Sequence, residues 1–77
     1  MDNREFLPVL DLYQAAYLQL QRIDPTLARQ GSRVVFQFPS TPLVIRAMQD
    51  YNDNPPVPVL DFVSNLRQLR ARMLSSR

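Results

Sequence analysis

The chain of 77 residues has no cysteine, histidine, tryptophan or lysine, and it has only one glycine. Without cysteine or histidine it has no disulfide, no thiol nucleophile and no imidazole for acid–base catalysis or zinc binding. Its serines and threonines therefore lack the histidine or lysine that would activate them. A single glycine cannot form a glycine-rich phosphate loop. We expect no catalytic, metal-binding or cofactor-binding residues, and we predict that the protein is not an enzyme.

The length and composition predict one small domain over residues 1–77, with an ordered core over about residues 6–74. Hydrophobic residues make up 45% of the chain and charged residues 21%, as is usual for a folded domain and unlike a disordered tail. No apolar run approaches the roughly 18 residues of a membrane span, and residues 1–5 lack the basic start of a secretion signal. We predict a cytoplasmic protein that does not contact membranes.

All nine basic residues are arginines, and four of them lie among residues 62–77, where there is no acid. Cations near the end of a helix complement its dipole, which explains the arrangement without a ligand. Arg67, Arg70 and Arg77 nevertheless fall within about 80° of each other on a helical wheel, whereas Arg72 points away. These three are candidate phosphate-facing residues, although no motif that reads bases accompanies them.

Three segments predict β-strands. Residues 5–9 are extended, and Pro8 restricts this segment to the edge of a sheet. Residues 23–29 form a weaker strand that is interrupted by Pro25, and a turn at Gln30-Gly31 follows. Residues 33–38 alternate regularly between apolar and polar side chains and contain no proline, so this strand is expected to be central. Its inward face would carry Val34, Phe36 and Phe38.

The first predicted helix covers residues 12–20, with Asp11 as its N-cap. It is apolar nearly all round, which is typical of a helix covered on more than one side. Leu18 lies opposite the main apolar stripe, and Tyr17 is the least clearly inward of the three tyrosines.

Two more helices are expected in the second half of the chain. Thr41 and Pro42 are typical of the first turn of a helix, and the pattern that follows continues to Tyr51. The last helix begins near Pro58, and its apolar face is expected to lie against the sheet. That face has helical spacing and consists of Val59, Phe62, Val63, Leu66, Leu69 and Met73.

The order strand, helix, hairpin, helix, helix predicts an α+β fold with a small, mostly antiparallel three-stranded sheet and three helices. Five motifs occur in this order: Asp-Leu at 11–12, Ala-Ala-Tyr-Leu at 15–18, Arg-Val-Val-Phe-Gln-Phe at 33–38, Tyr-Asn at 51–52, and Phe62 with Leu-Arg-Gln-Leu-Arg at 66–70. Over about residues 6–74 the chain thereby resembles a family of small bacterial and phage-associated domains of unknown function. Members of that family usually carry a glycine shortly after Ala-Ala-Tyr-Leu, where this chain has Gln21 and Arg22. The resemblance implies a fold and no established activity.

Four apolar residues do not fit the inward stripes of their helices, namely Leu18, Ile45, Leu60 and Leu74. Apolar residues that gather on a surface mark an interface, so these four are candidate interface residues. The function favoured by the sequence is a non-catalytic interaction module that binds a protein partner or itself as a homo-oligomer. The alternative is a nucleic-acid-binding module that uses the C-terminal arginines.

Overall fold

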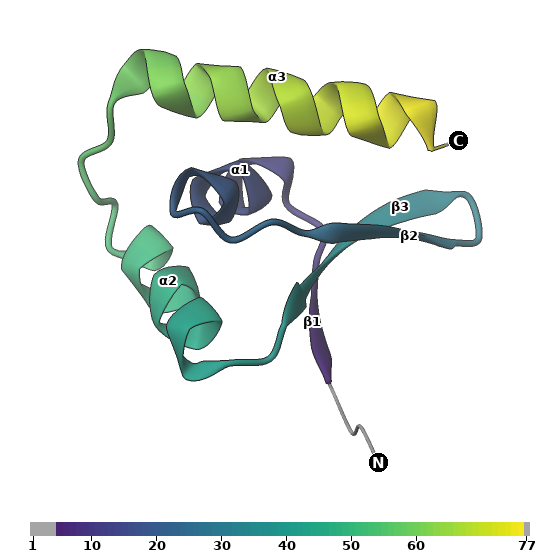
Figure 1. Cartoon of the computed structure of the whole chain (residues 1–77), viewed down its shortest axis with the longest axis horizontal. Helices are drawn as coiled ribbons and strands as arrows, with labels where there is room; N and C mark the ends of the chain where they lie inside the picture. Colours follow the sequence, from purple (N-terminus) through teal and green to yellow (C-terminus); the bar gives the residue numbers. More distant parts are fainter. Residues whose placement is uncertain (1–4, 77) are drawn as a thin grey trace.

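A three-stranded antiparallel sheet is present in the computed structural model, which describes residues 5–76 (Figure 1). The strands are β1 (Phe6–Val9), β2 (Thr26–Gln30) and β3 (Arg33–Pro39), in the order β1-β3-β2. The strand with the regular apolar–polar alternation over residues 33–38 is therefore central, as predicted. Leu7 pairs with Phe38 and Leu27 pairs with Phe36, so these side chains share the face of the sheet that meets the core.

Each edge strand has a proline within it or directly before it. Pro8 lies within β1, which pairs with β3 on one side only, as expected of a residue that cannot donate a ladder hydrogen bond. The prediction that the second strand begins at Ile23 is wrong, because β2 starts at Thr26, directly after Pro25. Gly31 occupies the hairpin turn with a φ of +66°, a conformation that glycine adopts without a steric penalty.

The three helices are α1 (Leu12–Leu20), α2 (Pro42–Asn52) and α3 (Val59–Ser75). Both predicted N-caps are confirmed: the Asp11 carboxylate accepts a hydrogen bond from the Tyr13 N–H at 2.8 Å, and the Thr41 hydroxyl accepts one from the Val44 N–H at 3.2 Å. α3 follows Pro58 and has no side-chain cap. The predicted order of elements, three helices and an antiparallel sheet, is thereby confirmed.

α1 is the central helix of the fold. α3 packs along α1, and α2 packs against α1 from another side (Figure 1). The core formed in this way contains Phe36 and Phe38 from β3 together with Val44 and Leu69 from α2 and α3. The expectation that α3 lies directly against the sheet needs correction, since the main neighbour of α3 is α1.

Two predicted side-chain positions are wrong. Leu18 was expected on the outer side of its helix, but it is 0% exposed because α1 is covered by α3 and α2 on different sides. It therefore cannot serve as a surface contact. Val59 was expected to face inward, but it is 69% exposed. Figure 1 shows the reason: the first turn of α3 extends beyond α1, so no element covers it.

The end of α1 adopts a non-glycine left-handed conformation. Arg22 has a φ of +67°. Its N–H donates to the Gln19 carbonyl at 2.8 Å, and the Ile23 N–H donates to the Leu18 carbonyl at 3.2 Å. These two bonds form a Schellman motif, in which the residue at the Arg22 position is usually glycine. The left-handed conformation is one that glycine adopts without the steric penalty that a Cβ brings.

We expect the substitution Arg22→Gly to stabilise the fold. A left-handed conformation costs a residue with a Cβ about 1–2 kcal/mol, whereas glycine instead loses about 0.5–1 kcal/mol of chain entropy. The free energy of unfolding should rise by about 0.5–1 kcal/mol, which thermal or urea denaturation can measure. Arg22→Ala is the control, because alanine keeps the Cβ. An equal gain from alanine would show that the arginine side chain, rather than its backbone angle, is the cause.

Candidate functional site

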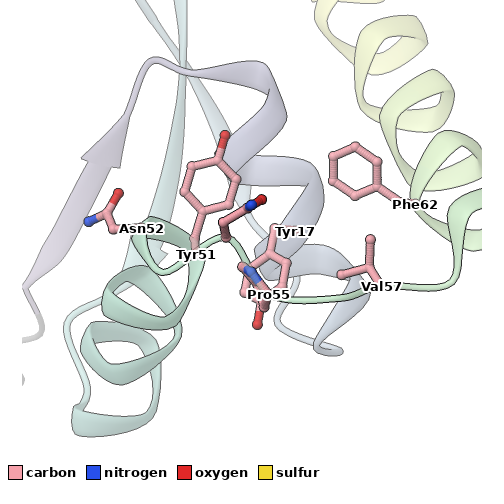
Figure 2. A pocket seen from close by; sticks show the side chains of 7 residues that line it. Tyr17, Tyr51, Asn52, Pro55, Val57 and Phe62 are labelled. Carbon is pink, nitrogen blue, oxygen red and sulfur yellow. The ribbon is translucent and has the colours of Figure 1, made fainter.

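An open apolar pocket of about 410 Å³ lies where the three helices approach one another at the α2–α3 connection (Figure 2). Each helix and the connecting segment contribute to it. Figure 2 shows Tyr51 of α2 and Phe62 of α3 on either side of the opening, with Val57 of the connection near Phe62. The lining residues are Tyr17, Tyr51, Asn52, Asn54, Pro55, Val57 and Phe62.

Two tyrosines form one wall of this pocket. The rings of Tyr17 and Tyr51 have centroids 5.7 Å apart and are tilted by 49°, within the range of favourable aromatic pairs. Tyr17 is buried even though the sequence places it least clearly inward, because α2 brings Tyr51 against this side of α1. Each tyrosine alone fits an ordinary packing residue, and only the fold brings them together.

A stiff connection keeps α2 and α3 apart. Asn54 follows the C-cap of α2 and has a left-handed conformation with a φ of 55°, and its N–H donates to the Tyr51 carbonyl at 3.2 Å. Asparagine tolerates this conformation better than most residues. Pro55 and Pro56 follow, and proline fixes φ near −65°. The pocket is therefore shaped by a connection with few accessible conformations.

The Tyr51 phenol lies in a negative environment. Burial raises its pKa above the ordinary value of 10.0, and the negative charge of Asp11 and a hydrogen bond to that carboxylate raise it further. Figure 2 shows the hydroxyl of Tyr51 pointing toward the segment between β1 and α1, which contains Asp11. The neutral phenol is thus favoured in the fold.

The pKa of Tyr51 predicts a loss of stability at alkaline pH. Because the folded pKa is raised, the stabilisation by this group is complete below pH 10.0 and is lost as pH rises through the folded pKa. We expect Asp11→Asn to lower the pKa of Tyr51, since asparagine removes the charge and still caps a helix well. Tyrosinate absorbance, with Tyr51→Phe to identify the signal, measures this. An unchanged pKa in Asp11→Asn would leave burial and the neighbouring Tyr13 as the causes.

Three aspartates lie close along the chain to the residues of α2, α3 and their connection that line the pocket. Residues 47–66 contain Asp50, Asp53 and Asp61 and no arginine. Asp50 lies in the last turn of α2 and Asp53 is its C-cap, whereas Asp61 lies in the first turn of α3. The segments that line the pocket thus carry net negative charge.

Three of the predicted interface residues are exposed but do not share one element. Ile45 is 43% exposed on α2, Leu60 is 82% exposed at the start of α3, and Leu74 is 49% exposed near its end. Leu18, as described above, is buried. Val59 is also exposed, although the sequence predicts that it faces inward. It lies two residues after Val57, which lines the pocket.

Two of the three arginines predicted to face phosphate lie within the described residues. Arg67 and Arg70 are exposed on α3, whereas Arg77 lies outside the described residues. Arg72 points elsewhere, as predicted, and donates to the Pro25 carbonyl at 3.3 Å. Arg33 of the hairpin lines a shallow hollow together with Met73 of α3, so the fold places a hairpin arginine beside the arginine-rich half of α3.

A polar network that the sequence does not reveal joins α1 to α3. The Gln19 side-chain amide donates to Asn65 at 2.6 Å and to Gln68 at 3.2 Å. Asn65 in turn donates to the Asp61 carbonyl at 2.8 Å. Gln19 and Asn65 are 46 residues apart in the sequence, and no local pattern predicts their contact.

These features define a small α+β domain with a mainly apolar pocket between its helices. Residues 47–66 are acidic, and the residues that follow them in α3 are rich in arginine. A family model described as "Domain of unknown function (DUF5659)" matches residues 4–75. The chain belongs to this family, which confirms the resemblance to a family of unknown function. The search of curated proteins and the search of solved structures each found no match.

No helix within residues 5–76 is long and apolar enough to span a membrane. In the same residues no three histidine, cysteine, aspartate or glutamate side chains are grouped as metal ligands would be. The cytoplasmic location stays a prediction.

Proposed function

We propose that this domain is a non-catalytic interaction module whose pocket binds a short segment of a protein partner. The segment would contribute an apolar side chain to the pocket of Tyr17, Tyr51 and Phe62, with basic residues beside it. The absence of histidine, cysteine and lysine favours binding over catalysis in this proposal.

The observation that carries the proposal is the uncovered start of α3. Val59 continues the apolar stripe of Phe62 but is 69% exposed, and the apolar pocket opens beside this turn. Interfaces combine such an apolar centre with a polar or charged rim. Asp50, Asp53 and Asp61 do not line the pocket but lie next to lining residues along the chain, which favours a basic partner through electrostatic complementarity.

The proposal is tested by NMR titration with two synthetic peptides. Both have a central leucine, and it is flanked by arginines in one and by glutamates in the other. We expect the basic peptide to shift the resonances of Tyr17, Tyr51 and Phe62 and the acidic peptide to leave them unchanged. Equal effects of the two peptides, or changes confined to another surface, would contradict the proposal.

Charge reversal beside the pocket gives the matched variants. Asp50→Lys with Asp53→Lys should abolish binding of the basic peptide. The fold should tolerate this change, because cations are favourable at the C-terminal end of a helix. Asp24→Lys is the control, since Asp24 is exposed and lines a different hollow. Binding that survives the double substitution would show that the acids do not select the partner.

The alternative is a nucleic-acid-binding module, which the proximity of the hairpin to the second half of α3 favours. Arg29 and Arg33 on the hairpin would join Arg67 and Arg70. Four neutralised phosphates predict a slope of about −3.6 for log affinity against log salt on duplex DNA. Arg33→Gln should reduce the magnitude of this slope by about 0.9, whereas Arg46→Gln on α2 should not. Affinity independent of salt would exclude this alternative.

A further inference from the structure

The second half of α3 carries an exposed apolar side chain next to basic side chains, which is the combination proposed above for the partner of the pocket. Arg67, Arg70 and Leu74 are spaced by three and four residues, so they are neighbours on one face of the helix. Leu74 is 49% exposed, and both arginines are exposed. We name these three residues the basic face. It presents one apolar side chain next to two cations.

A single molecule cannot bring its basic face to its own pocket. Twelve residues of continuous helix separate Phe62 from Leu74, which is about 18 Å along the axis. α3 runs along the long dimension of the molecule (Figure 1), whose principal extents are 36 × 29 × 17 Å. The pocket and Leu74 are therefore near opposite ends of α3, and Arg67 lies at the middle of the helix.

We propose that a second copy of this chain occupies the pocket, with Leu74 of one copy inserted between Tyr51 and Phe62 of the next. This inference rests on the proposed function of the pocket. Arg67 and Arg70 of the first copy would then lie near the aspartates of the pocket segments. Charge complementarity favours this occupant, because the acidic segments of residues 47–66 contain no arginine and residues 62–76 contain no acid.

The same charges oppose the other possible orientations. Two pockets facing each other would bring together Asp50, Asp53 and Asp61 of both copies, and two basic faces would bring together four arginines. Like-charge contacts of these kinds disfavour the wrong pairing. A pocket-to-face contact is heterologous, so each copy retains one free pocket and one free basic face, and association can continue beyond the dimer.

Two variants that each disable one half of the contact provide the test. Asp50→Lys with Asp53→Lys disables the pocket, and Leu74→Asp disables the basic face. We expect the mass of the unmodified chain to rise with concentration in sedimentation experiments, whereas each variant alone stays monomeric. An equimolar mixture of the variants should form a dimer and nothing larger, since it contains one intact pocket and one intact basic face per pair.

The control is Leu43→Asp, which introduces the same charge at an exposed leucine of α2 and should leave association intact. A monomeric unmodified chain, a monomeric mixture of variants, or equal disruption by Leu43→Asp would each overturn the inference. The peptide titration separates this inference from the proposed function. A chain that binds the basic peptide but stays monomeric keeps the proposed function and loses the second copy as partner, whereas failure of both experiments removes both.

Discussion

Replacing Phe36 with aspartate is expected to unfold the domain. Phe36 lies on the central strand, is 1% exposed and belongs to the core cluster. Truncation of a buried phenylalanine costs about 3–5 kcal/mol, and an unpaired buried carboxylate adds to that cost. A chain of this length is stabilised by only about 4–12 kcal/mol in total. We therefore expect circular dichroism to show no cooperative thermal transition.

Gln37→Asp is the matched control for this substitution. Gln37 is adjacent on the same strand but points to the opposite face of the sheet, and it is only half-buried. The poorer strand propensity of aspartate should cost no more than about 1 kcal/mol, so a cooperative transition should remain. A folded Phe36→Asp variant with a melting temperature near that of Gln37→Asp would refute the placement of Phe36 in the core.

Leu69→Ala is expected to have the second-largest effect on stability. Leu69 is 0% exposed and is the only fully buried residue of α3 in the described chain. Shortening a buried leucine to alanine costs about 2–5 kcal/mol, depending on how far the cavity collapses. For a domain of this size, such a loss should lower the melting temperature by at least about 10 °C.

Leu60→Ala removes the same atoms from the same helix and serves as the control. Leu60 is 82% exposed, so its truncation should change the free energy of unfolding by no more than about 0.5 kcal/mol. Similar melting temperatures for the two variants would mean that α3 is not held against α1 through Leu69.

Local patterns account for most of the secondary structure. Alternation predicts β3, Pro8 restricts β1 to an edge of the sheet, and Asp11 and Thr41 mark the starts of two helices. Each of these signals acts over a few residues and depends on steric limits or on one hydrogen bond, so neighbouring residues suffice to predict it. The start of β2 is the exception, because the strand was predicted from Ile23 and begins at Thr26, directly after Pro25.

The candidate site is poorly predicted because its parts come from distant segments. The positions of Tyr17 and Tyr51 within their own helices indicate only that each is a packing residue. Leu18 was assigned to the surface because a helical wheel shows which residues share a face but not how many faces neighbouring helices cover. The prediction that Val59 is buried was wrong for the converse reason. The apolar stripe of a helix can continue beyond the element that covers it.

The sequence by itself determined the α+β order of elements, the central strand, the caps and the lack of histidine, cysteine and lysine, because these depend on residue types and short-range geometry. Only the tertiary structure decided that α3 packs on α1 and that the pocket forms at the α2–α3 connection. Those features depend on which distant segments bury apolar surface against one another. The free energy of this burial is shared among segments that no local sequence pattern connects.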